Sequence, residues 1–307
     1  MFEANLKIAD VIIKMQSKFP LESHTEEEIA TLHTERYDNF TYKGSKKPDI
    51  FIDVRIVEKL PKVSGTKPMF ITYHFQDNSE NWRMLRKGDS YVYKTPLETK
   101  KQLMLVSRNF NKVTAYLLPK KDKGRVWSTG DLIYDFLQVL LINYFAQRKT
   151  GIFVHSIGIK DTNGRGLIFA GKSGAGKSTT ARIWYKHSKA MILNDDRIIV
   201  RKIGKQFFIH GSPWHGEFSD YLDSRIESAP LKNLFFIYHA KKNTARRILP
   251  KEAFSMLYPS LFPTFWDKTC LDNISSFSLD LIKNVPCYNL GFINNKRVID
   301  FVRKGRA

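Results

Sequence analysis

The chain has 307 residues, of which 42% are hydrophobic and 13% aromatic, so it can bury a core and does not have the composition of a disordered protein. No apolar run approaches the roughly 18 residues of a membrane-spanning helix, and the N-terminus lacks the layout of a signal peptide. We therefore expect a cytoplasmic protein without a membrane partner. Two cysteines, Cys270 and Cys287, make neither a disulfide framework nor a four-ligand metal set.

The formal net charge is +20, which suits nucleic acid, an acidic partner or an acidic ligand. The lysines are scattered through loop-like stretches, however, rather than gathered along one helical stripe. The sequence has no helix-turn-helix signature, zinc-finger spacing or basic-region heptads. We therefore expect a basic solvated surface, and a nucleic-acid-binding protein, which the charge alone supports, is the less favoured alternative.

Residues 1–125 are expected to form a β-rich N-terminal domain, with substrate recognition as its candidate role. The opening residues favour helix, and Thr25 with Glu28 three positions later has the spacing of a capping box. From residue 49 onward the pattern changes to β-rich segments separated by turns, which predicts an antiparallel meander. The predicted strands lie within residues 49–60, 69–75, 81–95 and 101–119.

A helix is predicted at residues 128–149, where apolar side chains recur at helical spacing. We place the domain boundary just before it, so that residues 126–307 form a second domain. Strands and helices alternate in this half, and a hairpin turns at Gly204, which favours a mixed sheet with flanking helices. Strands are expected near 151–159, 167–170, 190–194, 197–211, 233–240 and 286–292, and helices near 177–187 and 295–304.

Residues 171–178 read GKSGAGKS and fit the phosphate-loop pattern G-x-x-x-x-G-K-[ST] in full. Glycines let backbone N–H groups converge on phosphate, and the helix that follows adds its positive dipole end. Lys177 is expected to reach the β- and γ-phosphates, and the Ser178 hydroxyl to bind Mg²⁺. The pattern predicts a nucleoside triphosphate site formed by Gly171, Ser173, Gly174, Ala175, Gly176, Lys177, Ser178 and Thr179.

Two adjacent aspartates, Asp195 and Asp196, follow the loop after one helix and one strand. One carboxylate can hold Mg²⁺, directly or through water, and the other can take a proton from an acceptor hydroxyl. The alternative is that one of them caps a helix or lies on the surface. His155 lies in the preceding strand, from which it can hydrogen-bond an aspartate and orient it, or else serve the structure alone.

Taken together, His155, the loop at 171–178 and NDDRIIV at 194–200 resemble HPr kinase/phosphorylase, with wider kinship to ATP-dependent phosphoenolpyruvate carboxykinase. The resemblance covers roughly residues 151–240. It implies an α/β fold, α+β overall: a P-loop kinase domain with a mixed sheet and flanking helices, preceded here by the β-rich domain. It also implies an ATP- and Mg²⁺-dependent enzyme that phosphorylates a serine hydroxyl.

Carried over by position, the resemblance makes Lys177 a catalytic residue and gives the metal to Ser178 and Asp196. Asp195 would be the proton acceptor, with help from His155. The order of the two aspartates stays open at this point, because the residues alone fit either assignment.

The segment GSPWHGE at residues 211–217 departs from HPr kinases. It is similar to HPr-kinase-like proteins encoded with ribosomally made peptides, including lasso-peptide serine kinases. That similarity implies a peptide or protein substrate with an acceptor hydroxyl rather than HPr. It leaves open whether the chain forms a homo-oligomer. Trp214, His215 and Glu217 are candidate substrate contacts, and the alternative is a structural turn with Trp214 in the core.

Two other functions fit the residues less well. A nucleotide-hydrolysing regulatory or binding protein would turn over ATP regardless of any hydroxyl acceptor. A small-molecule kinase related to the carboxykinases is disfavoured by the short chain, which lacks an evident second metal site. Three arginines, Arg225, Arg246 and Arg247, can reach a transferring phosphate or be solvated surface charges.

Overall fold

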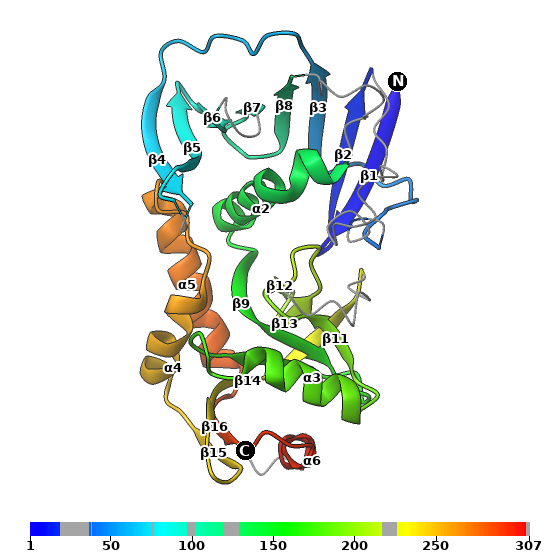
Figure 1. The fold of residues 1–307 in the computed structure, drawn as a ribbon, viewed down its shortest axis with the longest axis vertical. Coiled ribbons are helices and arrows are strands. Elements are labelled where there is room, and N and C mark those ends of the chain that lie inside the picture. Colours follow the sequence, from blue (N-terminus) through cyan, green and yellow to red (C-terminus); the bar gives the residue numbers. More distant parts are fainter. Residues whose placement is uncertain are drawn as a thin grey trace. The chain divides into compact units, whose positions relative to one another are not determined.

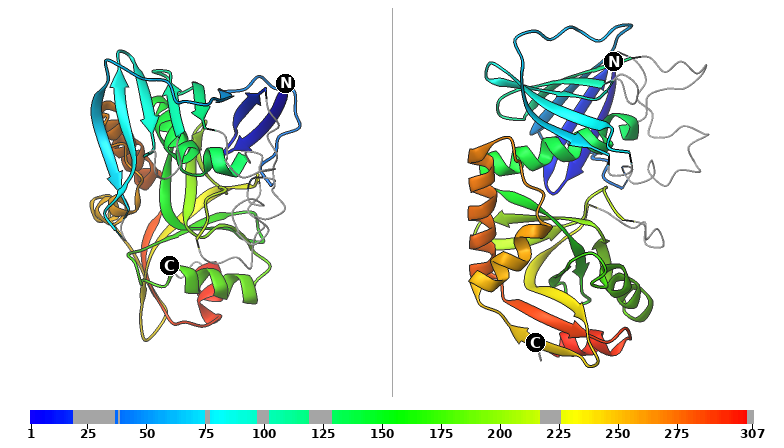
Figure 2. Two further views of the ribbon diagram at one scale, coloured as in Figure 1. Left: turned by 45° about the horizontal axis from the view of Figure 1, so that its top comes forward. Right: turned by 60° about the vertical axis from the view of Figure 1, so that its left-hand side comes forward.

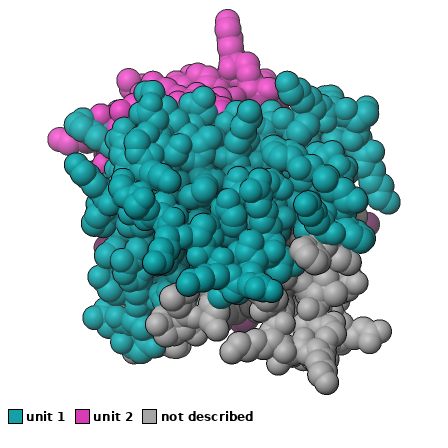
Figure 3. Space-filling model, turned by 90° about the horizontal axis from the view of Figure 1, so that it is seen from above, with its two compact units in different colours: residues 1–144, 264–268 teal, residues 145–263, 269–307 magenta. Residues whose placement is uncertain are grey.

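The computed structural model of the chain forms two compact units (Figures 1 and 3). Unit 1 comprises residues 1–144 and 264–268, and unit 2 comprises residues 145–263 and 269–307. The fold is α+β, with one mixed sheet in each unit. The division falls inside helix α2 (Thr129–Arg148), which matches the helix predicted there. The structure describes residues 1–18, 37, 39–74, 77–96, 102–118, 129–216 and 226–304.

Unit 1 is built on an eight-stranded sheet of order β1-β2-β3-β8-β7-β6-β5-β4. Strands β4 to β8 form the predicted antiparallel meander, whereas β2, β3 and β8 run parallel as neighbours. Helix α2 packs on one face of this sheet, where the rings of Phe136 and Tyr93 are 5.1 Å apart. The strands are β1 (Phe2–Ile8), β2 (Val11–Ser17), β3 (Ile50–Ile56), β4 (Lys67–Tyr73), β5 (Glu80–Lys87), β6 (Ser90–Lys94), β7 (Gln102–Val106) and β8 (Lys112–Leu117).

The first residues form the β1–β2 hairpin, so the prediction of a helical start is wrong. The turn residues Ala9 and Asp10 have φ of 46° and 62°. Positive φ at both central residues is the hairpin geometry that matches strand twist, and it is usually marked by Asn-Gly or Asp-Gly. This turn uses Ala-Asp instead, which hides the signal. The segment that contains Thr25 and Glu28 lies outside the described residues.

Unit 2 contains three parallel strands, β10, β14 and β16, with antiparallel strands beside them. The pairings β9–β10, β10–β14, β14–β13, β13–β12 and β12–β9 form a closed circuit. The mixed sheet and the hairpin at Gly204 are as predicted, whereas the four-residue β15 was not predicted. The strands are β9 (Gly151–Lys160), β10 (Gly166–Ala170), β11 (Met191–Asn194), β12 (Arg197–Ile203), β13 (Gln206–His210), β14 (Ser228–His239), β15 (Thr244–Arg247) and β16 (Cys287–Phe292).

Helices cover both faces of the parallel strands in unit 2 (Figure 2). Leu167 and Phe169 of β10 pack in one cluster with residues of α3 (Lys177–His187) and α6 (Arg297–Arg303). The alternate residues of β10 pack in a second cluster with α4 (Pro250–Leu257) and α5 (Lys268–Asn284). A strand buried on both faces is apolar throughout, as β10 is. In the described parts of the chain, no helix is long and apolar enough to cross a membrane.

Candidate functional site

The glycine-rich loop joins the carboxyl end of β10 to the amino end of α3 (Figure 1). This confirms the strand–loop–helix context that a phosphate loop requires. Gly174 and Gly176 have φ of 77° and 97°, a backbone region that glycine adopts without steric cost. A Cβ atom on Gly176 would lie 2.7 Å from Cζ of Phe292 and 2.9 Å from Cε1 of His239. The loop can approach these neighbours closely only because position 176 is glycine.

Lys177, the first residue of α3, folds back over the loop. Its Nζ donates hydrogen bonds to the carbonyl oxygens of Gly171 at 3.0 Å and Lys172 at 3.4 Å. Burial lowers the pKa of Lys177, and the nearby charge of Asp196 opposes that shift. Neutral carbonyls are weaker partners for an ammonium group than a charged phosphate oxygen is. The lysine is therefore placed to exchange these carbonyls for phosphate.

The turn between β11 and β12 contains Asp195 and Asp196 and lies at the same edge of the sheet as the loop. Strand β9 sets this arrangement, because it pairs with β10, β11 and β12. Ala170 at the end of β10 pairs with Ser156 of β9, and Arg197 at the start of β12 pairs with His155 of β9. The backbone N–H of Ser156 also donates to the carbonyl of Asp196 at 3.0 Å. One strand thus connects the glycine-rich loop with the aspartate turn.

Basic side chains surround the Asp196 carboxylate. Nδ1 of His155 lies 2.9 Å from Oδ1, and Nε of Arg197 lies 3.3 Å from Oδ2. Burial raises the pKa of Asp196, but the hydrogen bond from His155 and the charges of Arg197 and Lys177 outweigh it and hold the pKa below its usual value. The predicted bond from His155 to an aspartate is present, and the aspartate is Asp196 rather than Asp195. Asp196 is consequently ionised at neutral pH.

Asp195 has different surroundings. It is buried, and its Oδ1 accepts a hydrogen bond from the backbone N–H of Gly216 at 2.8 Å. A Cβ atom on Gly216 would lie 2.8 Å from Oδ2 of Asp195, so glycine permits this approach. The carboxylate therefore contacts the loop at residues 211–216, which the sequence singled out as a candidate substrate loop.

Asn194 joins the aspartate turn to that loop. Its Oδ1 accepts hydrogen bonds from the backbone N–H groups of Asp196 at 2.8 Å and Arg197 at 2.7 Å. Its Nδ2 donates to the carbonyls of Ser212 at 2.9 Å and Trp214 at 3.0 Å. The sequence reasoning assigned no role to Asn194. An asparagine at a strand end can bond its own backbone two residues later, and that pattern is the signal that would have found it.

The side chains of the 211–216 loop face inward. Trp214 is fully buried, with its ring 5.8 Å from that of Phe153, so it belongs to the core and offers no exposed stacking surface. This is the structural alternative weighed for Trp214. His215 is 8% exposed, and its Nδ1 lies 3.2 Å from the carbonyl of Gly216. Glu217 and Arg225 lie outside the described residues.

A magnesium ion needs few protein ligands at such a site, because Mg²⁺ usually keeps several waters and binds through one or two carboxylates and substrate phosphates. The ionised Asp196 and the exposed hydroxyl-bearing Ser178 at the start of α3 fit that requirement. Among the described residues, including those of this site, no group of three or more His, Cys, Asp or Glu side chains is arranged to hold a metal. Arg246, one of the three candidate phosphate arginines, pairs with Glu252 at 3.1 Å on the surface.

Comparison with known proteins finds similarity to a family model and to solved structures. The family model described as SynChlorMet cassette protein ScmC matches residues 128–295, more than half of the chain. The structure of the Hpr(Ser) kinase/phosphatase from Coxiella burnetii is similar at 9% sequence identity and a TM-score of 0.29, over 50% of this chain and 90% of that chain. A search of curated proteins found no match.

Proposed function

The chain belongs to the ScmC family of SynChlorMet cassette proteins, and from the geometry of its site we propose that it is an ATP- and Mg²⁺-dependent kinase. The proposed reaction transfers the γ-phosphoryl group to a hydroxyl, that of serine, on a peptide or protein. The observation that carries the proposal is the phosphate loop held by β9 at the same sheet edge as the aspartate turn. Nucleic acid has no part in this reaction.

In the proposed reaction the acceptor oxygen attacks the γ-phosphorus. The new O–P bond forms as the bond to the β–γ bridging oxygen breaks, ADP leaves, and the hydroxyl proton passes to a carboxylate. Lys177 and the loop N–H groups bind the phosphates and stabilise the charge that moves to the leaving oxygen. Mg²⁺, held by Ser178 and Asp196, would supply further neutralisation of phosphate charge. Most of the rate gain would come from positioning.

The two aspartates are assigned by their surroundings. A carboxylate that cations keep ionised is a good metal ligand and a weak base, which suits Asp196 to the metal. Asp195, oriented by the N–H of Gly216, is then the proton acceptor. His155 acts on Asp196 in this scheme, by orienting the metal ligand rather than the base.

The test is phosphoryl transfer to peptides. The protein is incubated with ATP, Mg²⁺ and a library of peptides that each contain one serine, and the products are analysed by mass spectrometry for an added phosphate. We expect transfer to a subset of the library. Lys177→Ala and Asp195→Asn should each abolish transfer while the thermal unfolding profile stays cooperative. Asp196→Asn should raise the Mg²⁺ concentration that half-maximal transfer requires.

Matched controls separate transfer from binding. Lys172→Ala removes a neighbouring exposed lysine of the loop and should leave transfer largely intact. If ATP is hydrolysed at the same rate with and without every peptide, the protein is a nucleotide-hydrolysing regulator and the kinase proposal fails. If Asp195→Asn transfers phosphate normally whereas Asp196→Asn is inactive at every Mg²⁺ concentration, the two aspartate roles are reversed.

A further inference from the structure

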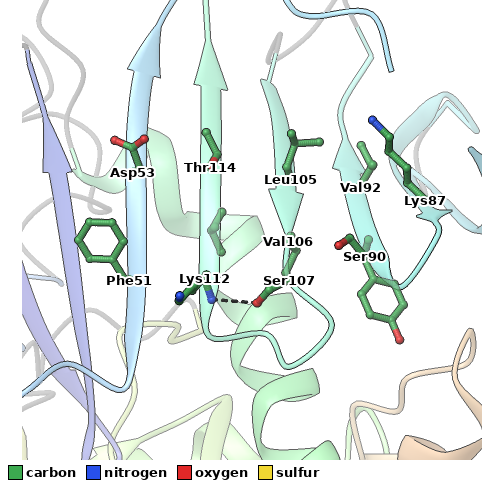
Figure 4. A pocket seen from close by; sticks show the side chains of 12 residues that line it. Phe51, Asp53, Lys87, Ser90, Val92, Leu105, Val106, Ser107, Lys112 and Thr114 are labelled. Carbon is green, nitrogen blue, oxygen red and sulfur yellow. Dashed lines mark hydrogen bonds between the residues drawn. The ribbon is translucent and has the colours of Figure 1, made fainter. Parts of the chain in front are cut away.

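A cavity of about 550 Å³ opens on the sheet of unit 1, on the face turned away from α2 (Figure 4). Side chains from β3, β8, β7 and β6 make its floor, and the β5–β6 hairpin contributes its edge. The proposed phosphoryl transfer uses none of these residues. The cavity is large enough for several side chains of an extended peptide, since ligand pockets begin at about 300 Å³.

Strand register arranges the floor in two rows. In the first row Asp53, Thr114, Leu105 and Val92 are direct partners on successive strands. The second row begins with Phe51 beside Lys112, and Ser107 follows, whose Oγ accepts a hydrogen bond from the N–H of Lys112 at 3.0 Å. It ends with the pair formed by Ser90 and Lys87. The floor thus combines apolar side chains with hydroxyl groups, while both lysines lie in the second row.

The net charge of this cavity is positive. Asp53, the one carboxylate among the described residues that line it, is already paired, because Nε of Arg55 donates to Oδ2 at 2.8 Å. Lys87 and Lys112 are exposed, and neither ammonium group forms an ion pair with a residue that the structure describes. An anionic ligand would therefore gain two cationic partners without displacing an existing carboxylate.

We infer that this face binds an extended, acidic segment of the peptide substrate. Lys112 stands on β8 and Lys87 on β5, three strand spacings apart, which is roughly 14 Å at about 4.8 Å per spacing. An extended chain that crosses the strands covers this span in about four residues at about 3.3 Å each. The structure thus favours two carboxylates four positions apart, with apolar side chains between them beside Leu105 of β7.

The inference rests on the proposed function for its identification of the occupant as the kinase substrate. Contacts remote from the reacting hydroxyl are a common source of substrate binding energy. The acceptor serine itself needs only to reach the phosphate loop, so a separate docking segment would select the peptide by charge pattern. Part of the basic charge of the chain would then bind a ligand at a defined site, and that ligand is an acidic peptide rather than nucleic acid.

The test measures binding without ATP, so it does not depend on phosphoryl transfer. Three fluorescein-labelled peptides are titrated with the full-length protein and followed by fluorescence anisotropy. The first contains Glu-Leu-Val-Leu-Glu, the second has glutamine at both acidic positions, and the third has two adjacent glutamates. We expect the first to bind about fivefold more tightly than the second, the amount that two exposed ion pairs supply. The third should lie between them.

Variants assign the binding to this face. Lys87→Gln with Lys112→Gln should remove the preference for the first peptide, whereas Lys62→Gln, an exposed lysine of unit 1 outside the cavity, should keep it. Thr114→Trp fills the cavity without changing charge and should weaken binding of all three peptides, with the far-ultraviolet circular dichroism spectrum as the folding check. Equal affinity for the first two peptides would overturn the inference, as would an equal loss in Lys62→Gln.

A labelled oligothymidine serves as the nucleic-acid probe. If it binds and the double lysine variant abolishes that binding, while the peptides bind without regard to charge, the face is a nucleic-acid site and the peptide inference is wrong. If the peptide preference is found but no peptide is ever phosphorylated, the docking face stands and the kinase proposal fails. The two proposals can therefore be rejected separately.

Discussion

Asn194→Ala is the substitution that should do most damage to the site while touching neither aspartate side chain. The native side chain is buried, with 1% of the residue exposed, and it bonds two N–H groups of the aspartate turn and two carbonyls of the facing loop. Alanine keeps the backbone conformation accessible but cannot replace any of these bonds. The turn and the loop would then lose their shared anchor.

The size of the destabilisation follows from the number of backbone polar groups that lose their hydrogen-bond partner. The N–H groups of Asp196 and Arg197 and the carbonyl of Ser212 each lose this partner, whereas the carbonyl of Trp214 keeps a contact with Ser212 Oγ at 3.3 Å. A buried polar group without a partner costs about 1–3 kcal/mol, so three such groups at the lower end give about 3 kcal/mol. At roughly 2–4 °C per kcal/mol for a domain of the size of unit 2, the midpoint of thermal unfolding of that unit should fall by roughly 6–12 °C.

Thermal unfolding followed by circular dichroism measures this shift, and mantATP fluorescence measures nucleotide binding in parallel. The control is Asn163→Ala, an exposed asparagine in the β9–β10 turn whose Oδ1 accepts one bond, from Arg165 N–H at 3.2 Å. It should shift the midpoint by less than about 2 °C, as surface substitutions typically do. Asn194→Asp keeps the shape but turns an acceptor toward the two carbonyls, and it should also destabilise. A midpoint unchanged in both Asn194 variants would refute the reasoning.

Three further predictions concern other parts of unit 2. Gly176→Ala should abolish mantATP binding and should lower the unfolding midpoint more than Gly164→Ala does. Both glycines have positive φ, which costs an alanine roughly 1–2 kcal/mol, but of the two only Gly176 has neighbours within 4 Å of an added Cβ atom. Equal shifts of the midpoint in the two variants would contradict this. Burial raises the pKa of Asp161, but bonds from Arg303 and Thr162 N–H hold it below its usual value. The stability it contributes is therefore present above about pH 4 and is lost as the pH falls through the lowered pKa, so Asp161→Asn should lower the unfolding midpoint more at pH 7 than at pH 3. Burial raises the pKa of Cys287 to about 12, so iodoacetamide at pH 8 should modify it, as judged by mass spectrometry, only after guanidinium is added.

Local patterns in the sequence predicted much of unit 2. The glycine-rich loop between β10 and α3, helix α3 and the hairpin at Gly204 depend on short-range signals: a glycine pattern, a helical period and a turn residue. The β1–β2 hairpin was missed because Ala-Asp takes the place of the usual turn residues. Strand β15 was missed because TARR has no apolar alternation, and its strand structure comes from pairing with β16.

The partners within the site were harder to predict than its members. Spacing placed His155, the loop and the two aspartates near one another, but it could not say which aspartate His155 bonds. That choice is fixed by the register of β9 against β12 and by the turn that follows Asn194. The bond between Gly216 and Asp195 joins residues 21 positions apart through a loop that no local pattern describes.

The contrast between Asp195 and Asp196 shows how neighbouring residues of one type acquire different chemistry. His155, Arg197 and Lys177 keep Asp196 ionised, which favours holding a cation over accepting a proton. The described hydrogen bond of Asp195 comes instead from a neutral N–H on the loop at residues 211–216. Movement of that loop would therefore act directly on the Asp195 carboxylate, whereas it would reach the backbone around Asp196 through Asn194 and through the bond from Ser212 Oγ to the Arg197 carbonyl at 2.5 Å. In the proposed kinase, the position of the loop would thus act most directly on the proton acceptor, while the pairing of β9 with β12 also holds the turn that contains the metal ligand.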